Sequence, residues 1–187
     1  MTVPRELKLQ QTREGVRMTN VPVKELQKLR TSSTSIKGQE VTSLLDLSSR
    51  YKLTSPLQEL DLNLDVSQAQ EVILRFSNTK GEHVDVGYSV AGEVLYIDRT
   101  KSGKMDFKET FSGKHTSPLS LENGKLRLHL LLDVASVEVF ANDGRTVMTD
   151  IFFPTEEFTK VELVSTGTTK LQDSKAYTLK SIWDNPT

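Results

Sequence analysis

The stretch LQELDLNLDVS, residues 57–67, indicates the fold class, because its leucines alternate with polar side chains. Leu60, Leu62 and Leu64 are separated by Asp61 and Asn63. Successive side chains of a β-strand point to opposite faces, so this period of two predicts a strand with one apolar and one solvated face. A helix would repeat its apolar residues every three or four positions instead.

Strand-like segments continue in series from this stretch towards the end of the chain. The separators between them are TKGE, AG, ENG, NDG and TGTT, which are rich in residues that form turns. Many short strands with hardly any helical pattern are typical of a sandwich or a barrel. We expect an all-β fold, an antiparallel β-sandwich of the jelly-roll or concanavalin A-like type with two packed sheets. The segments are EVILRFSN, HVDVGYSV, EVLYIDRT, KLRLHLLLD, SVEVFAND, RTVMTDIFF, KVELVST and KAYTLKSIW.

The first 50 residues are less regular. VPRELKLQQTREGVRMTNVPV, residues 3–23, predicts two strands joined at REG, and KELQKLR, residues 24–30, predicts a short helix or turn. TSSTSIKGQE, residues 31–40, is so polar that we interpret it as a loop within the domain. The whole chain, residues 1–187, is expected to form one domain.

Composition excludes several classes of protein. The formal net charge is −1, with 24 basic and 25 acidic residues mixed along the chain, which argues against a nucleic-acid partner. The absence of cysteine excludes disulfides, zinc–thiolate sites and thiol nucleophiles. No apolar run approaches the roughly 20 residues of a membrane-spanning helix, and no signal peptide opens the chain. We therefore expect neither a nucleic acid nor a membrane as partner.

Motifs for metal binding and catalysis are also missing. His83, His115 and His129 are the only histidines, and they lie far apart without the spacing of metal ligands. The sequence contains no Gly-x-Ser-x-Gly elbow and no glycine-rich phosphate loop. We predict no metal and no cofactor. A glycosidase needs only two carboxylates across a cleft, so composition alone leaves that chemistry open.

Three segments resemble the C-terminal β-sandwich module of family 32 glycoside hydrolases, which include levanases, inulinases and invertases. MTVPREL, residues 1–7, resembles the end of the family's catalytic propeller and the lead into the sandwich. LYIDRTKSG, residues 95–103, resembles an Asp-Arg strand and its following loop, and LRLHLLLDVASVEVFANDGRTVMTDIFFP, residues 126–154, resembles the most distinctive segment of the module. The resemblance implies that residues 1–30 lead in from an N-terminal propeller.

The same resemblance implies that the chain by itself is not an enzyme. The family's three catalytic carboxylates lie in propeller motifs that read Asn-Asp-Pro-Asn-Gly, Arg-Asp-Pro and Glu-Cys. Here Asn142-Asp143 lacks the Pro-Asn continuation, Asp98-Arg99 has the reverse order, and Glu-Cys cannot occur without cysteine. No catalytic residue is therefore assigned.

The resemblance implies an accessory module of a fructan-hydrolysing enzyme that packs against or stabilises the propeller of the same polypeptide. The alternative is a fructan-binding module for levan or inulin. The parent enzyme is expected to be extracellular. Separated from its propeller, the module is expected to expose an apolar patch and can self-associate through it.

A sugar site needs carboxylates and an arginine for the sugar hydroxyls, and an apolar platform. Tyr96 and Phe140 could supply the platform, whereas Phe152 and Trp183 are interpreted as core residues. The candidate carbohydrate-binding residues are Asp98, Arg99, Asp133 and Glu138.

The other interpretation of Glu138 is structural. Glu138 would share one strand face with Phe140, and Val137 and Val139 would occupy the other, so this strand has apolar groups on both sides. A glutamate in such surroundings needs a charged partner, and we expect an internal ion pair with Arg99. Asn142-Asp143-Gly144 (NDG) is interpreted as a hairpin turn that needs positive φ angles.

Overall fold

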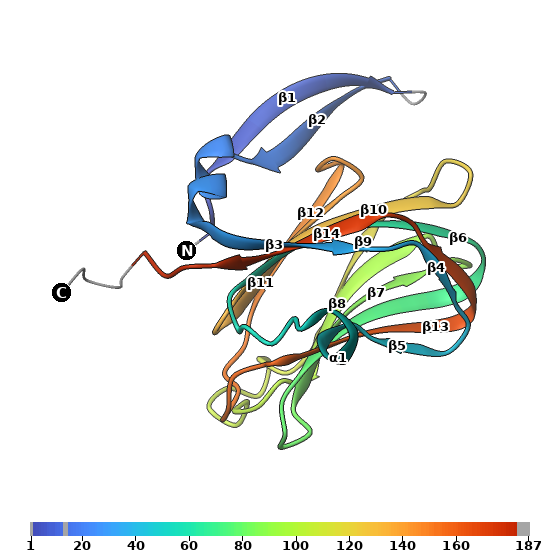
Figure 1. The fold of residues 1–187 in the computed structure, drawn as a ribbon. Coiled ribbons are helices and arrows are strands. Elements are labelled where there is room, and N and C mark those ends of the chain that lie inside the picture. The colour runs from blue at the N-terminus through green and yellow to red at the C-terminus, as the bar shows by residue number, and fades with distance from the viewer. Residues whose placement is uncertain (1, 13–14, 183–187) are drawn as a thin grey trace.

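One long strand, β6 (Gln58–Ser77), belongs to both layers of a β-sandwich (Figure 1). The computed structural model describes residues 2–12 and 15–182. The first half of β6 pairs with β10 and β14, and its second half pairs with β7. Strand β13 pairs with β6 across the bend between the two halves. All of these pairings are antiparallel, which confirms the predicted antiparallel sandwich.

The elements occur in the following order and with the following bounds. They are β1 (Arg5–Thr12), β2 (Gly15–Pro22), the 3-10 helix η1 (Lys24–Leu29), β3 (Arg30–Ile36), β4 (Gln39–Val41), β5 (Leu44–Asp46), α1 (Leu47–Tyr51), β6 (Gln58–Ser77), β7 (His83–Ser89), β8 (Val94–Lys101), β9 (Lys114–Pro118), β10 (Lys125–Asp133), β11 (Ser136–Ala141), β12 (Thr146–Ile151), β13 (Lys160–Leu171) and β14 (Ser174–Leu179).

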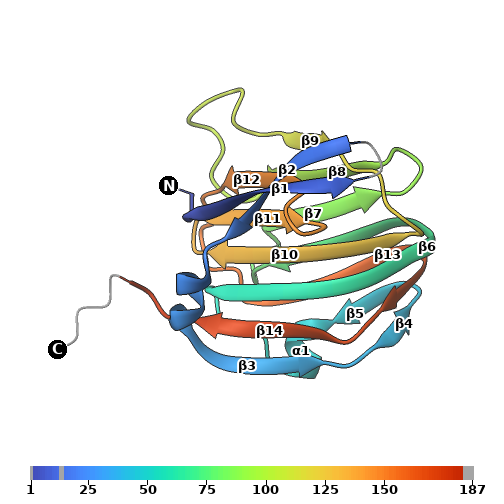
Figure 2. The ribbon, with the colours of Figure 1, turned by 90° about the horizontal axis from the view of Figure 1, so that it is seen from above.

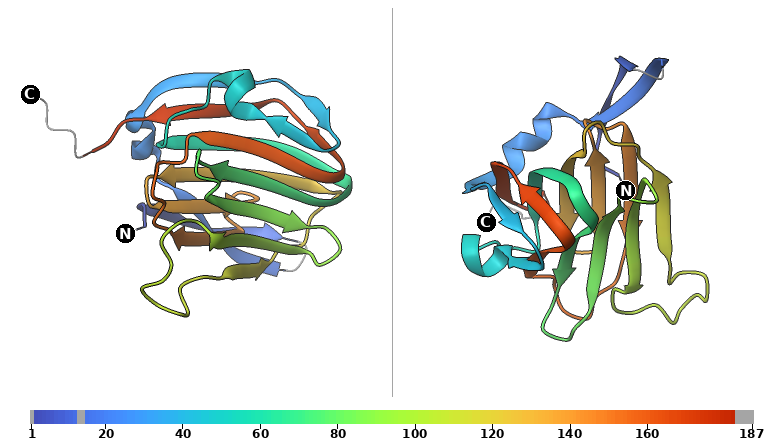
Figure 3. Two further views of the ribbon diagram at one scale, coloured as in Figure 1. Left: turned by 90° about the horizontal axis from the view of Figure 1, so that it is seen from below. Right: turned by 90° about the vertical axis from the view of Figure 1, so that its right-hand side faces the viewer.

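Each layer contains part of β6. One layer has the order β12-β11-β10-β6-β14-β3, which Figure 2 shows face on. The other has the order β9-β8-β7-β6-β13-β5, with β4 paired to the end of β13, and is seen from below in Figure 3 (left). Strands β1 and β2 form a separate two-stranded sheet that projects from the sandwich in Figure 3 (right).

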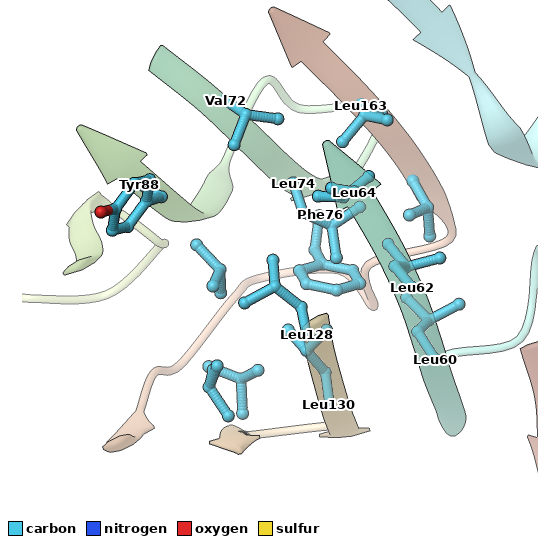
Figure 4. Packing of buried hydrophobic residues seen from close by; sticks show 14 of the residues in the cluster. Leu60, Leu62, Leu64, Val72, Leu74, Phe76, Tyr88, Leu128, Leu130 and Leu163 are labelled. Atoms are coloured by element: carbon cyan, nitrogen blue, oxygen red, sulfur yellow. The ribbon is translucent and has the colours of Figure 1, made fainter. Parts of the chain in front are cut away.

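The core lies between the two layers, and β6 contributes to both of its sides. Leu60, Leu62 and Leu64 from its first half, and Leu74 and Phe76 from its second half, are almost completely buried (Figure 4). Full burial of one such side chain contributes about 1.5–3 kcal/mol relative to exposure. The alternation that predicted the strand is therefore the pattern that fills the core.

Two other predictions about core residues have different outcomes. Phe152 is completely buried and packs 5.2 Å from Phe158 between ring centroids, so its assignment to the core is confirmed. Trp183 lies outside the residues that the structure describes.

The predicted strand boundaries are wrong where β6 passes from one layer of the sandwich to the other. LQELDLNLDVS and EVILRFSN are parts of one strand, and TGTT is a bulge within β13 rather than a turn. Gly167 has a φ of 83°, and a Cβ at this position would lie 2.7 Å from the carbonyl oxygen of Gln68. Glycine therefore lets β13 bend closely around β6, so its presence in TGTT did not indicate a chain reversal.

The N-terminal predictions are partly correct. The two predicted strands and the short helix after them are confirmed as β1, β2 and η1, while residues 13 and 14 of the predicted REG connection lie outside the described residues. TSSTSIKGQE is not a loop, because it contains most of β3 and the start of β4. Strand β3 lies at the edge of its layer and pairs with β14, so its serine and threonine side chains can remain in solvent while Ile36 enters the core.

The NDG turn between β11 and β12 has the predicted geometry. Asn142, Asp143 and Gly144 have φ angles of 46°, 60° and 77°. A Cβ at Gly144 would lie 1.8 Å from the carbonyl oxygen of Asn20, and the amide of Asn20 donates to the Gly144 carbonyl at 3.0 Å. Glycine is thus required both by the turn and by contact with β2.

This double requirement can be measured by comparing two glycines. Gly81 has a φ of 81°, but a Cβ there would meet nothing within 4 Å. We expect Gly81→Ala to lower the free energy of unfolding by about 1 kcal/mol, from backbone strain alone. Gly144→Ala should cost about 2 kcal/mol, because it also separates the turn from β2. Urea denaturation of both variants tests this, and equal losses would contradict a role for the contact with β2.

Candidate functional site

The β1–β2 hairpin stands over the outer side of the layer that contains β11 and β12 (Figure 1). Its last residues lead through η1 into β3, which belongs to that same layer. Two clusters of charged side chains, one at each end of residues 3–30, connect this lead-in segment to the sandwich.

The first cluster centres on Glu138 of β11, whose side chain is buried. Its two carboxylate oxygens accept hydrogen bonds from Arg5 Nη2 at 2.7 Å and from the amide of Val3 at 2.6 Å. Arg5 also donates to Thr149 Oγ1 at 3.0 Å and lies over the ring of Phe140, 5.2 Å from its centroid. Glu138 therefore fastens the beginning of the lead-in to the sandwich.

The second cluster centres on Glu59 of β6. Arg30 donates from Nε and Nη2 to the two carboxylate oxygens, both at 2.6 Å, and His129 Nε2 lies 2.7 Å from the same carboxylate. The guanidinium of Arg30 also stacks over Tyr177, 3.8 Å from the ring centroid. Burial alone would raise the pKa of Glu59, but the hydrogen bonds from Arg30 and His129 outweigh burial and lower it to about 2.

The hairpin held in this way exposes an apolar face, as expected. Leu9 pairs with Met18 in the register of the two strands, and Leu7 and Val16 lie on the same face. Each of these four side chains is more than half exposed, and Leu9 is 78% exposed. We call these four residues the hairpin face. Whether the chain self-associates through it stays a prediction.

A third charged cluster closes the open edge of the sandwich, and we call it the edge clasp. Asp150 of β12 lies 2.8 Å from His115 Nδ1 of β9 and 3.7 Å from Arg99 Nη1 at the end of β8. Arg99 also donates to the carbonyl of Ile151 at 2.9 Å. Burial raises the pKa of Asp150, although the hydrogen bond with His115 and the charge of Arg99 act in the opposite direction. The clasp joins the edge strands β12 and β9 of the two layers.

The expected ion pair between Glu138 and Arg99 is therefore wrong. Glu138 lies opposite Thr149 in the β11–β12 register, on the outer face, whereas Asp150 lies opposite Val137, on the core side. Neighbouring residues of β12 point to opposite faces. Glu138 thus meets Arg5 outside the sandwich, while Arg99 meets Asp150 at its inner edge.

The four candidate carbohydrate-binding residues do not form one site. Asp98 lies on β8 in one layer, where it accepts hydrogen bonds from the amide and hydroxyl of Thr100. Asp133 is exposed at the end of β10 in the other layer, close in register to Glu138. Arg99 belongs to the edge clasp. Their contact with sugar stays a prediction.

The predicted sugar platform is wrong, because Tyr96 and Phe140 are both buried. The hydroxyl of Tyr96 donates to Glu71 at 2.8 Å, and Lys114 covers its ring at 3.4 Å from the centroid. Phe140 lies beneath Arg5 in the first cluster. The sequence does not show which residues lie across the sheet from these two rings, so their burial could not be inferred from it.

Sequence reasoning also missed Arg5, Arg30 and Glu59. Glu59 lies within the stretch that indicated the fold, where it was indistinguishable from a solvated outward residue. Arg5 lies within MTVPREL, which was recognised only as a lead-in. The need of Glu138 for a charged partner is the one signal that pointed towards Arg5, and no comparable signal pointed to Arg30 or Glu59.

A polar hollow of about 440 Å³ lies beside the NDG turn. Its charged side chains are already paired, since Arg145 Nη1 lies 3.2 Å from Glu122, Arg127 contacts Asp143, and Lys125 Nζ lies 2.8 Å from Asp65 outside the hollow. Its lining residues are Asn63, Leu64, Glu122, Lys125, Leu126, Arg127, Asn142, Asp143, Arg145 and Gln172.

Within residues 2–12 and 15–182, no group of three or more histidine, aspartate or glutamate side chains could hold a metal ion. In the part of the chain that is described, no helix has both the length and the apolar character needed to cross a bilayer.

Comparison with known proteins agrees with the fold and the motifs. Residues 25–178 match the sequence profile "Glycosyl hydrolases family 32 C terminal". The levanase of Bacillus sp. (strain L7) is 35% identical over 98% of this chain, which spans 20% of that protein. The extracellular exo-inulinase of Aspergillus awamori is 36% identical over 60% of this chain, and the match spans 21% of that protein. The crystal structure of exo-inulinase from A. awamori superposes with a TM-score of 0.80 at 25% identity, and covers 97% of this chain and 36% of that one.

The role of Glu138 can be tested on the hairpin itself. Glu138→Gln leaves Arg5 without its charged partner, and we expect the free energy of opening of β1 and β2 to fall by about 2 kcal/mol. Amide hydrogen exchange of residues 5–11 and 15–21 should then be about 30-fold faster. Glu6→Gln is the matched control, because the Glu6–Lys8 pair is exposed on the same hairpin. Equal effects of both variants would contradict the anchoring role.

The second cluster predicts a specific dependence on pH. The pKa of Glu59 is about 2 in the folded chain and about 4.5 when unperturbed, so its contribution is present above pH 4.5 and is lost as the pH falls towards 2. This carboxylate should account for about 3 kcal/mol of the acid-induced loss of unfolding free energy. The loss should be correspondingly smaller in Glu59→Gln, measured by urea denaturation from pH 7 to pH 2.5. If the unfolding free energies of the wild type and Glu59→Gln change in parallel with pH, this role of Glu59 is contradicted.

Proposed function

The chain belongs to the family of C-terminal domains of family 32 glycosyl hydrolases, and we propose that it docks a catalytic propeller of the same polypeptide in a fructan-hydrolysing enzyme. It is a non-catalytic accessory domain in this proposal, and residues 1–30 lead in from the propeller. The levanase and the exo-inulinase that it resembles are several times longer, which leaves room for a separate catalytic domain.

The hairpin face is the observation that carries the proposal. An isolated two-stranded hairpin is marginally stable in water, and its unpaired edges and apolar side chains favour a partner. Here the hairpin is fixed to the sandwich by the Arg5–Glu138 ion pair at one end, and the Arg30–Glu59 ion pair holds the segment that follows it. Leu7, Leu9, Val16 and Met18 nevertheless remain exposed. A neighbouring domain laid on this face would bury them.

Substrate choice belongs to the catalytic domain in this proposal. The parent enzyme would hydrolyse a fructan such as levan or inulin, because relatives of this chain are named for those activities. We propose an extracellular location for the parent enzyme on the same basis, since one relative is named an extracellular exo-inulinase. The sandwich contributes stability and orientation rather than chemistry.

Removal of apolar side chains from the hairpin face tests the docking role. The purified chain should bind a hydrophobic dye and self-associate with rising concentration in sedimentation velocity. Leu9→Ser should weaken this association about tenfold or more, because burial of one leucine contributes about 1.5–3 kcal/mol. Leu44→Ser is the control, because Leu44 is 54% exposed but lies on β5, outside the hairpin.

Two outcomes would contradict the proposal. A strictly monomeric chain with no dye binding would contradict the docking role of the hairpin face. Release of fructose from levan, inulin or sucrose by the purified chain, abolished by one carboxylate substitution, would contradict the non-catalytic assignment.

A further inference from the structure

The loop between β8 and β9 carries an aromatic cluster that the docking role does not use. Phe107 and Phe111 of this loop lie 4.6 Å apart between ring centroids, and both contact Phe153 at 5.5 and 5.6 Å. Phe111 is buried beneath the other two rings, whereas Phe107 is 53% and Phe153 41% exposed. Two neighbouring phenyl rings are thus presented to solvent.

The cluster is supported from below by the edge clasp. The guanidinium of Arg99 lies 4.0 Å from the ring centroid of Phe111, and Asp150 holds the same guanidinium from the other side. The loop is also tied to the segment of Phe153, because the amide of Lys104 donates to the Phe153 carbonyl at 2.8 Å. The exposed rings therefore rest on a fixed base.

Close contact between the loop and residue 153 requires a glycine. Gly103 has a φ of 114°, and a Cβ there would lie 2.3 Å from the Phe153 carbonyl oxygen. Gly103 ends the LYIDRTKSG segment, and Phe153 belongs to the IFFP end of the second segment. The two most distinctive sequence segments thus meet at the aromatic cluster.

An open hollow of about 660 Å³ lies beside the aromatic cluster, and its lining includes sequence neighbours of both exposed rings. Asp106 and Lys104 in its wall precede Phe107, and Thr155 in its wall follows Phe153 by two residues. Glu82 completes the polar side and accepts hydrogen bonds from the amide and the hydroxyl of Thr155, at 2.8 and 2.9 Å. The full lining is Glu82, Gly103, Lys104, Met105, Asp106 and Thr155.

We propose that Phe107, Phe153 and the adjoining hollow bind a segment of a fructan chain. The rings would support the C–H faces of the sugar units, and Lys104, Asp106 and Glu82 would hydrogen-bond their hydroxyls. A saccharide matches this site because the two exposed rings lie beside Lys104, Asp106 and Glu82, whose charged groups can hydrogen-bond hydroxyls.

The site is also placed to remain open in the parent enzyme. The β8–β9 loop lies at the end of the sandwich opposite the β1–β2 hairpin in both Figure 1 and Figure 3 (right). A domain docked on the hairpin face would leave Phe107 and Phe153 accessible. The inference rests on the proposed function only for the choice of fructan as the saccharide.

Affinity electrophoresis in native gels tests the inference, with levan or inulin in the gel and dextran as the control polysaccharide. The wild-type chain should be retarded by a fructan and not by dextran. Phe107→Ala and Phe153→Ala should each weaken binding about tenfold, because each removes one ring from the platform. Leu44→Ala should keep the wild-type affinity, since it removes an equally exposed side chain elsewhere. Unchanged thermal unfolding confirms that the variants are folded.

Three outcomes would overturn the inference. These are no retardation of the wild type by levan or inulin, equal losses in Phe107→Ala and Leu44→Ala, and loss of binding in Arg145→Ala while Phe107→Ala binds normally. The last result would place the saccharide in the polar hollow beside the NDG turn. Self-association through the hairpin face is measured separately and should be unaffected by Phe107→Ala, so failure of one proposal is distinguishable from failure of the other.

Discussion

The continuity of β6 through both layers is the constraint on which the rest of the structure depends. Because one strand of 20 residues supplies the centre of each layer, its core-facing leucines set which of its side chains must face outward. Glu59 is one of these outward residues, and it lies where the chain enters β3 after η1. The strand that organises the core therefore also positions the carboxylate that holds Arg30.

The two attachment clusters use charge where the core uses apolar area. A buried ion pair contributes little net stability against an apolar replacement, but removal of one partner is costly, so such pairs favour one arrangement over others. Ion pairs can therefore position the lead-in segment without using its apolar side chains, which stay available for contact with a neighbouring domain. Arg5–Glu138 and Arg30–Glu59 specify where the lead-in lies, and the hairpin face remains available.

Periodicity and turn chemistry were enough to predict the layers, the N-terminal hairpin and the NDG turn, because each depends on neighbours in sequence. Partners across the sheet depend on register, which the sequence does not show. Glu138 was correctly judged to need a cation, but Arg5 rather than Arg99 supplies it. TSSTS was not predicted as a strand, because an edge strand can be polar. Gly167 was interpreted as part of a turn, but glycine also occurs where a strand bends.

Attachment of the lead-in at two points has a mechanical consequence. A segment fixed at one residue can swivel about it, whereas a segment fixed near residue 5 and again at residue 30 has a defined axis and a defined tilt. Contact between Gly144 and Asn20 adds a third support away from that axis. The sandwich therefore holds the lead-in segment at three separate points, and these points set the orientation of the hairpin and of any domain that rests on it.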